Sequence, residues 1–249
     1  MLSAMWLALW LTTLGFAQST SPAVARAAGE AATTVPVLPP GVHNQTLSRD
    51  GGEAIRYAIS IPPGYSPAAR VPLVLALHFG GNPVGAGRAV LDLLIRPALA
   101  DLGAIVVAPD SIDGGWSGRQ NEHAVHTLLD AVLKTYSVDP RKVIVTGFSM
   151  GGAGTWHWAN KFPERFSAAI PVAGRPTGSA SAWRVPVFAV HSQDDERVPI
   201  GPAQRQIEEL KQLGKNAEIV VLTGITHYET SRYVEGLRRA VPWVKDLWK

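Results

Sequence analysis

The sequence predicts an α/β fold built on a mostly parallel, doubly wound sheet with helices on both faces. Its 249 residues suit a single domain of that class. Hydrophobic residues make up 46% of the chain, which is enough for a sizeable core. Beyond about residue 54, strand-like and helix-like segments alternate, and several of the strand-like segments are apolar throughout. Such runs are typical of parallel strands that helices cover on both sides.

The expected strands are short runs bounded by turn residues. The first, residues 54–60, alternates apolar and polar side chains and suggests an edge strand. In the second, Pro72 stands near the start of the strand, where its missing N–H is tolerated. The full set comprises residues 54–60, 71–77, 104–108, 143–146, 167–172, 186–190 and 217–222.

The expected helices lie between these strands. Gly214 marks the end of the fourth helix, because glycine commonly follows the last helical turn. Pro242 falls inside the last helix and should kink or split it, since proline has no N–H to donate. The full set comprises residues 86–101, 119–136, 153–160, 202–213 and 231–248.

The composition excludes several classes of function. The net charge is only +3 and no basic run concentrates it, so we expect no nucleic-acid partner. The absence of cysteine excludes disulfides, thiolate metal sites and a cysteine nucleophile. His123 and His126 lack a third metal ligand at a suitable spacing, and residues 110–113 lack the rest of a calcium loop. We therefore expect no metal and no cofactor.

The N-terminal segment is typical of an export signal. Residues 1–17 carry no charge and contain an apolar run that is too short to span a bilayer comfortably. Cleavage would follow Ala17 or Ala25. We expect a secreted or periplasmic protein without stable membrane insertion. Its parts would be a signal peptide over residues 1–25, a linker over 26–40 and the folded domain over 41–249.

The sharpest motif is G-x-S-x-G over residues 147–151, centred on Ser149. It directly follows an expected strand and precedes an expected helix, which is the context that a nucleophile elbow requires. The serine would occupy a strained backbone position from which its hydroxyl projects. Gly147 and Gly151 would flank it because side chains there would collide across so tight a bend.

A serine hydroxyl needs a base to take its proton. In sites built on a nucleophile elbow, the chain order is serine, then acid, then histidine. Three histidines follow Ser149. His157 lies on the helix behind the turn, and His191 ends a strand. His227 follows the last strand, in a loop that can fold over the serine, and is therefore the expected base.

The acid and the oxyanion donors are expected in loops at the ends of strands. Spacing after the strand over residues 186–190 leaves both Asp194 and Asp195 open as the acid. The N–H of Met150 is one expected donor to a developing oxyanion. The second would come from the glycine-rich loop after residue 77, where we favour Gly80 over Phe79.

From about residue 54 to the C-terminus, the chain resembles α/β-hydrolase esterases of the feruloyl-esterase, polyhydroxybutyrate-depolymerase and dienelactone-hydrolase-like group. The resemblance is carried by Asp-Pro-Arg-Lys-Val over residues 139–143, the serine motif over 147–152, Thr-Trp at 155–156 and Phe-Pro-Glu-Arg-Phe over 162–166. It implies an α/β-hydrolase fold and a serine esterase that needs no cofactor.

The resemblance also implies roles for single residues. The group's H-G-x-x-D-x-x-V-P element is similar to residues 191–199, with Ser192 in place of glycine, and it makes Asp195 the acid. The group's His-Gly-x-Gly loop is similar to residues 78–81, with Phe79 in place of the first glycine. On this alignment His78 and His191 are scaffold residues.

The expected pocket is an open one. Residues 173–185 are too few for the helical lid that many relatives of the group insert there, so the cleft would suit a bulky or polymer-attached ester. Trp116 and Trp183 lie in loops at the carboxyl ends of strands, where ligands bind in such sheets. They are the expected substrate-stacking residues, with cover of the core edge as the alternative.

The sequence therefore favours a secreted serine esterase that uses Ser149, His227 and Asp195 on small-molecule or polymer-attached esters, including carbohydrate-linked and aromatic ones. Its rate should fall in acid as His227 gains a proton. One alternative is a serine peptidase similar to prolyl oligopeptidases, which share the serine motif. The other is a binding protein without catalysis on the same scaffold.

Overall fold

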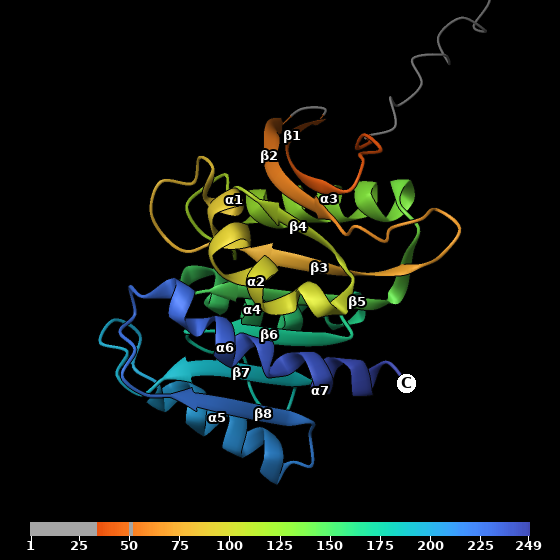
Figure 1. The fold of residues 1–249 in the computed structure, drawn as a ribbon. Coiled ribbons are helices and arrows are strands. Elements are labelled where there is room, and N and C mark those ends of the chain that lie inside the picture. The colour runs from red at the N-terminus through yellow and green to blue at the C-terminus, as the bar shows by residue number, and fades with distance from the viewer. Residues whose placement is uncertain (1–33, 50–51) are drawn as a thin grey trace, which may run out of the picture. The chain divides into compact units, whose positions relative to one another are not determined.

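The computed structural model describes residues 34–49 and 52–249. Within these residues, eight strands form one sheet in the order β1-β2-β4-β3-β5-β6-β7-β8 (Figure 1). The strands are β1 (Gly41–Arg49), β2 (Gly52–Ile61), β3 (Val71–Leu77), β4 (Ile105–Pro109), β5 (Val138–Phe148), β6 (Ala168–Val172), β7 (Val187–Ser192) and β8 (Ala217–Leu222). From β4 to β8 every neighbouring pair is parallel, whereas β2 runs antiparallel to both β1 and β4.

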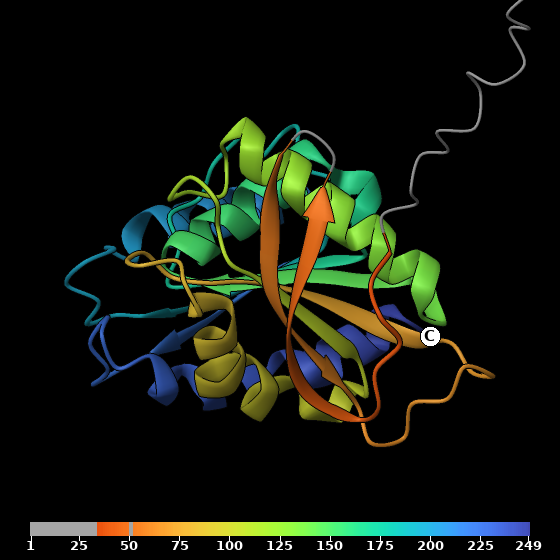
Figure 2. The same ribbon diagram turned by 90° about the horizontal axis from the view of Figure 1, so that it is seen from above.

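Helices cover both faces of this sheet, as expected. One face carries α3 (Arg119–Thr135), α4 (Met150–Lys161) and α5 (Gly201–Gln212). The other carries α1 (Ala86–Val90), α2 (Arg96–Leu99), α6 (Val234–Arg238) and α7 (Ala240–Leu247) (Figure 2). The mostly parallel sheet between two helical layers confirms the predicted fold class.

The apolar strands supply both halves of the core. Successive side chains of a strand point to opposite faces, so a run such as β3 must be apolar at every position to fill both layers. Leu73, Leu75 and Leu77 pack with α3 and α4, while Val74 and Ala76 pack with the helices on the opposite face.

Strand β1 was not among the expected elements. Its side chains are mostly polar and are partly or fully exposed, and Leu47 alone among its nine residues is buried. An edge strand of this kind takes its stability from backbone pairing, which leaves little hydrophobic pattern to recognise. The expected edge strand over residues 54–60 is therefore β2, an inner strand that pairs on both sides.

Two expected helices are interrupted near prolines. The helix expected over residues 86–101 is divided into α1, a π-helical turn over Leu91–Ile95, α2 and a final 3₁₀ turn. Pro97 lies in α2 and has no N–H for the preceding turn. The last helix splits at Arg239 into α6 and α7, because Pro242 cannot donate to the carbonyl four residues earlier.

The described part of the expected linker packs against the domain. Val35 is buried in the core on the α3 side. The hydroxyl of Tyr136 accepts the N–H of Leu38 at 3.1 Å and donates to the carbonyl of Pro36 at 2.8 Å. Val35, Pro36 and Leu38, which the sequence assigns to the linker, therefore contact the domain.

The expected signal peptide, residues 1–25, lies outside the described residues. Among residues 34–49 and 52–249, no helix combines the length and the apolar character that crossing a membrane requires.

We expect Tyr136→Phe to lower the free energy of unfolding by about 1 kcal/mol, because the substitution removes the hydroxyl that holds Leu38 and Pro36. Urea denaturation followed by tryptophan fluorescence measures the change. Tyr228→Phe is the matched control, since Tyr228 is 76% exposed. Equal unfolding midpoints for the wild type and Tyr136→Phe would show that these two hydroxyl bonds contribute nothing to stability.

Candidate active site

Ser149 occupies a sharp turn between β5 and α4. Its backbone has φ 58° and ψ −113°, a combination that costs free energy for a residue with a side chain. Its N–H donates to the carbonyl of Val172 on the neighbouring strand β6 at 3.0 Å, and its own carbonyl accepts the N–H of Ala153 in the first turn of α4. These bonds fix the strained turn between the sheet and the helix.

The flanking glycines are required by close backbone contacts. A Cβ atom on Gly147 would lie 2.5 Å from the carbonyl oxygen of Leu77 and 2.6 Å from that of Gly151. A Cβ on Gly151 would overlap the carbonyl group of Leu77 on β3. The glycines of the serine motif thus allow β3, β5 and α4 to meet at one point. The sequence predicts this, since side chains at these two positions would collide across so tight a bend.

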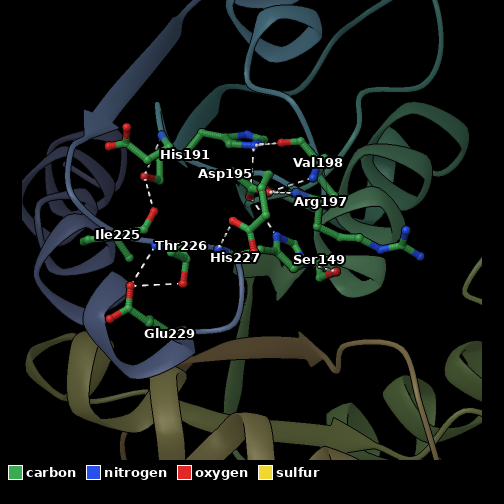
Figure 3. A network of polar contacts seen from close by, with 12 residues as sticks. Ser149, His191, Asp195, Arg197, Val198, Ile225, Thr226, His227 and Glu229 are labelled. Carbon is green, nitrogen blue, oxygen red and sulfur yellow. Dashed lines mark hydrogen bonds and ion pairs between the residues drawn. The ribbon is translucent and has the colours of Figure 1, made fainter.

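Ser149, His227 and Asp195 form a continuous chain of hydrogen bonds (Figure 3). Nε2 of His227 lies 2.8 Å from Oγ of Ser149, and its Nδ1 lies 2.7 Å from Oδ2 of Asp195. Because a carboxylate only accepts hydrogen bonds, Nδ1 is assigned the proton and Nε2 is free to accept from the serine hydroxyl. His227 is 4% exposed, and the side chain of Asp195 is fully buried.

Asp195 is oriented by the backbone that follows it. Its Oδ1 accepts the N–H groups of Arg197 at 3.0 Å and Val198 at 2.7 Å, which leaves Oδ2 for the imidazole of His227. Asp194, which the spacing left open, instead accepts the N–H of Gly224 at 2.6 Å. The structure therefore brings Asp195 and not Asp194 to His227.

Three side chains hold the loop that carries His227, one at the end of β7 and two in the segment that follows it. Ser192 donates its hydroxyl to the carbonyl of Ile225 at 2.5 Å. The carboxylate of Asp194 accepts the N–H of Gly224, and that of Glu196 accepts the N–H of His227 at 3.1 Å. A glycine at position 192 would have no hydroxyl for the first of these bonds. Ser192 therefore adds a fixed point beneath the histidine loop.

His191 and His78 are buried parts of the scaffold. Nε2 of His191 donates to the carbonyl of Val198 at 2.8 Å. Nε2 of His78 accepts the N–H of Ser111 at 2.9 Å, so its Nδ1 carries the proton toward the carbonyl of Phe79 at 2.6 Å. Burial lowers the pKa of both imidazoles, which keeps them neutral in the folded protein.

The backbone around Phe79 favours Gly80 as a donor toward the cleft. The carbonyl of Phe79 is directed to His78, and the C=O and N–H of one trans peptide point in opposite directions. The N–H of Gly80 is therefore turned away from His78. Gly80 and Met150 both line the cleft above Ser149.

This cleft has a volume of about 830 Å³. Its aromatic walls are Phe79, from the loop after β3, and Tyr228, which directly follows His227 and is 76% exposed. Two arginines, Arg175 after β6 and Arg197 after β7, also line it. The sequence analysis gave a substrate role to none of these four, although all of them lie in loops that follow strands of the sheet.

The expected substrate contacts of Trp116 and Trp183 are corrected by the structure. Trp116 is 2% exposed, and its indole N–H donates to the carbonyl of His78 at 2.9 Å. Trp183 is 1% exposed and packs edge-on against Trp156, with ring centroids 5.0 Å apart. Both indoles fold inward because each finds an apolar partner and a carbonyl acceptor there, so neither reaches the cleft.

The residues weighed as metal ligands have other partners. Nδ1 of His123 lies 2.9 Å from the guanidinium of Arg49, and His126 packs against Trp158 and Phe162. Asp110 accepts the N–H groups of Gly85 and Gly87 at 2.8 Å and 2.9 Å, which anchors the start of α1. No cluster of metal-ligating side chains occurs in the part of the chain that the structure describes.

Comparison with known proteins places this site in a family. The model of the dienelactone hydrolase family matches residues 93–235, more than half of the chain. The chain belongs to the dienelactone hydrolase family. This match spans Ser149, Asp195 and His227.

Several relatives of this chain are named as esterases. The chain is 27% identical over 197 residues to the probable feruloyl esterase C of Aspergillus terreus, covering 76% of this chain and 70% of that protein. It is 27% identical to feruloyl esterase C of Emericella nidulans, covering 65% of this chain and 63% of that protein. The crystal structure of a thermostable esterase superposes with a TM-score of 0.68 at 23% identity, over 82% of this chain and 62% of that one. The chain therefore has the α/β-hydrolase fold, and it is a serine carboxylic ester hydrolase.

We expect Ser192→Ala to lower kcat by roughly tenfold with little change in KM, because the histidine loop loses a fixed point and the base is held less well. Ester hydrolysis at saturating substrate measures the effect. Ser167→Ala is the matched control: its hydroxyl donates to the carbonyl of Val143 at 3.0 Å beside the start of β6, away from the cleft. Equal losses of kcat in the two variants would assign Ser192 a purely structural role.

We also expect the free energy of unfolding to fall as the pH drops from about 7 to 5. Neutral His78 and His191 have lowered pKa values, so below the ordinary histidine pKa the unfolded chain binds more protons than the folded one. The slope approaches about 1.4 kcal/mol per pH unit for each histidine. Urea midpoints across this range measure it. His191→Asn should show a shallower slope, and an unchanged slope would contradict the assignment.

Proposed function

We propose that this protein is a secreted serine esterase whose catalytic triad is Ser149, His227 and Asp195. The observation that carries the proposal is the hydrogen-bond chain from the serine hydroxyl through the imidazole to the buried carboxylate. Together with a strained serine at the base of an open cleft, this arrangement supports acyl transfer from an ester to water.

In the first half of the reaction, Nε2 of His227 takes the proton of Ser149 as Oγ attacks the ester carbonyl. Asp195 stabilises the imidazolium that forms. The N–H groups of Met150 and Gly80 hold the tetrahedral oxyanion. Met150 is also the first residue of α4, where the helix dipole favours negative charge. His227 then gives its proton to the leaving alcohol.

In the second half, a water molecule takes the place of the alcohol. His227 removes a proton from the water, which attacks the acyl carbonyl, and the same donors hold the second oxyanion. The acid then leaves and Ser149 regains its proton. His227 must be neutral at the start of each half, so the rate falls when acid protonates it.

The substrates that we propose are carbohydrate-linked, aromatic or polymer-attached esters. The cleft opens above Ser149, and the exposed ring of Tyr228 together with Phe79 offers apolar faces on which a sugar or phenyl ring can pack. The names of the relatives, feruloyl esterases, agree with an aromatic acyl group. Such esters occur outside cells, which fits the apolar N-terminal segment expected as an export signal.

We expect Ser149→Ala to lower kcat by roughly 10⁴-fold or more, because no other group can form the acyl-enzyme. Hydrolysis of a short p-nitrophenyl ester measures the loss, and a fluorophosphonate probe should label the wild type but not the variant. Ser66→Ala, in the loop between β2 and β3, is the matched control. Equal hydrolysis by wild type and Ser149→Ala, without labelling, would favour a binding protein.

A panel of acetyl, butyryl, octanoyl and feruloyl esters then reports the depth of the pocket. A peptide substrate in the same panel separates the esterase from a serine peptidase on the same fold. Faster cleavage of the peptide than of every ester would replace the proposed function.

A further inference from the structure

We propose that a groove beside β1 and β2 binds the neutral sugar chain of a polymer-attached ester while the ester bond lies at Ser149. This inference rests on the proposed esterase function, and it adds a second binding site outside the catalytic cleft. The groove has a volume of about 450 Å³. Its lining includes Asn44, Thr46, Arg56, Val84, Arg88 and Asp110.

The floor of the groove is one face of the two edge strands. Asn44 on β1 pairs with Ala58 on β2, and Thr46 pairs with Arg56. Paired residues point to the same face of a sheet, and so do alternate residues of one strand. Ala58 packs in the core on the α1 side, so the other three side chains lie on that side as well. They are exposed, and they present an amide, a hydroxyl and a guanidinium group to the groove.

Asp110 fixes the wall of the groove to its floor. Its side chain is only 6% exposed, and it accepts the N–H groups of Gly85 at 2.8 Å and Gly87 at 2.9 Å on the wall. Its Oδ2 also accepts Nε of Arg56, on the floor, at 3.4 Å. A site whose two sides are held in place before binding loses less conformational entropy when a ligand arrives.

The charges in the groove are balanced, which favours a neutral ligand. Arg56 forms an ion pair with Asp110, and Arg88 on α1 forms one with Asp92 at 2.5 Å. Each guanidinium group thus has a carboxylate beside it. An anion would gain little attraction here, because each positive charge is already neutralised.

The polar groups that remain suit sugar hydroxyls. Within residues 34–49 and 52–249, the terminal nitrogens of Arg56, the hydroxyl of Thr46 and the amide nitrogen of Asn44 donate to no protein group. A sugar hydroxyl can accept from each of these donors, and it can donate to the oxygen of Thr46. Val84, which is 62% exposed, adds an apolar side chain on which the C–H face of a sugar ring can pack.

One loop connects the groove with the catalytic cleft. Residues 79–81 of this loop line the cleft, and Val84 and Gly85 line the groove. Since five positions separate Gly80 from Gly85, their Cα atoms are at most about 18 Å apart. In Figure 1, β1 and β2 lie at the end of the sheet beyond β3 and β4, with α1 beside them. A short oligosaccharide in the groove can therefore carry an ester bond that reaches Ser149.

Binding without turnover is the first test. Calorimetric titration into Ser149→Ala uses unesterified xylohexaose, cellohexaose and mannohexaose, with hexagalacturonate as the acidic counterpart. We expect at least one neutral hexasaccharide to bind, and the corresponding disaccharide to bind more weakly. Failure of all three neutral chains to bind, or binding of hexagalacturonate alone, would overturn the proposal.

The variants are Thr46→Val and Arg56→Gln in the same background. Each should weaken binding of the neutral hexasaccharide by about three- to tenfold, because it removes hydrogen bonds to the ligand. Thr46→Val preserves the shape of the side chain, so it tests the site even if the loss of Arg56 disturbs the wall. Arg56→Lys keeps the charge but not the planar fork, and it should fall between.

Two matched controls lie outside the groove. Ser48→Ala removes a hydroxyl from the same strand as Thr46, and Arg70→Gln removes a guanidinium group from the loop before β3. Both should leave the affinity unchanged. Equal affinities in Thr46→Val, Arg56→Gln and the parent protein would show that the sugar binds elsewhere, which contradicts the proposal.

The active enzyme provides a kinetic test. A hexasaccharide ester is compared with the ethyl ester of the same acid, chosen as the acid that the ester panel shows to be cleaved fastest. We expect the wild type to show a higher kcat/KM for the hexasaccharide ester, mainly through a lower KM. The combined Thr46→Val and Arg56→Gln variant should bring the ratio toward one. A ratio that is equal in the wild type and this variant would count against the groove.

The two proposals fail in different ways. If the protein hydrolyses no ester but Ser149→Ala binds a hexasaccharide through Thr46 and Arg56, the groove stands and the proposed function falls. If esters are hydrolysed but the affinity for sugar does not depend on these two residues, the groove falls and the proposed function stands.

Discussion

The strained turn at Ser149 is the constraint on which the site depends. A serine at φ 58° is stable only where the surrounding backbone leaves no alternative, and here β3, β5, β6 and the start of α4 all contact the turn. The absence of side chains at Gly147 and Gly151 is what lets them approach. The result is a hydroxyl fixed at the edge of the sheet, where four other loops can reach it.

The strand order places those loops on two sides of the serine. The loop after β3 lies on one side of the serine, and the loops after β6, β7 and β8 lie on the other. Gly80, one of the two proposed oxyanion donors, comes from the first side. His227, its hydrogen-bond partner Asp195 and the two arginines of the cleft wall come from the second. A parallel sheet produces this separation without any additional element, because the carboxyl ends of its strands all meet at one edge.

Much of this arrangement could be predicted from the sequence because it follows from topology. Chain order selected His227 among three histidines, and the structure brings its Nε2 to the serine hydroxyl. The roles of aromatic residues in loops could not be predicted in this way. Nothing local distinguishes Trp116, whose N–H finds a buried carbonyl, from Tyr228, which remains exposed, because the difference arises from packing against distant elements. Strand β1 was not predicted for a related reason: it is held by backbone pairing, which leaves no hydrophobic pattern in the sequence.

The bond from Ser192 to the histidine loop has a consequence for how this site can be rebuilt. The segments over residues 192–196 and 224–227 are joined by three side-chain contacts to backbone, all of them donated or accepted by the first segment. A chimaera whose imported acid-bearing segment carried glycine at position 192 would lose one of these contacts to the native base loop. The two segments therefore form one transplantable unit, which must be exchanged together.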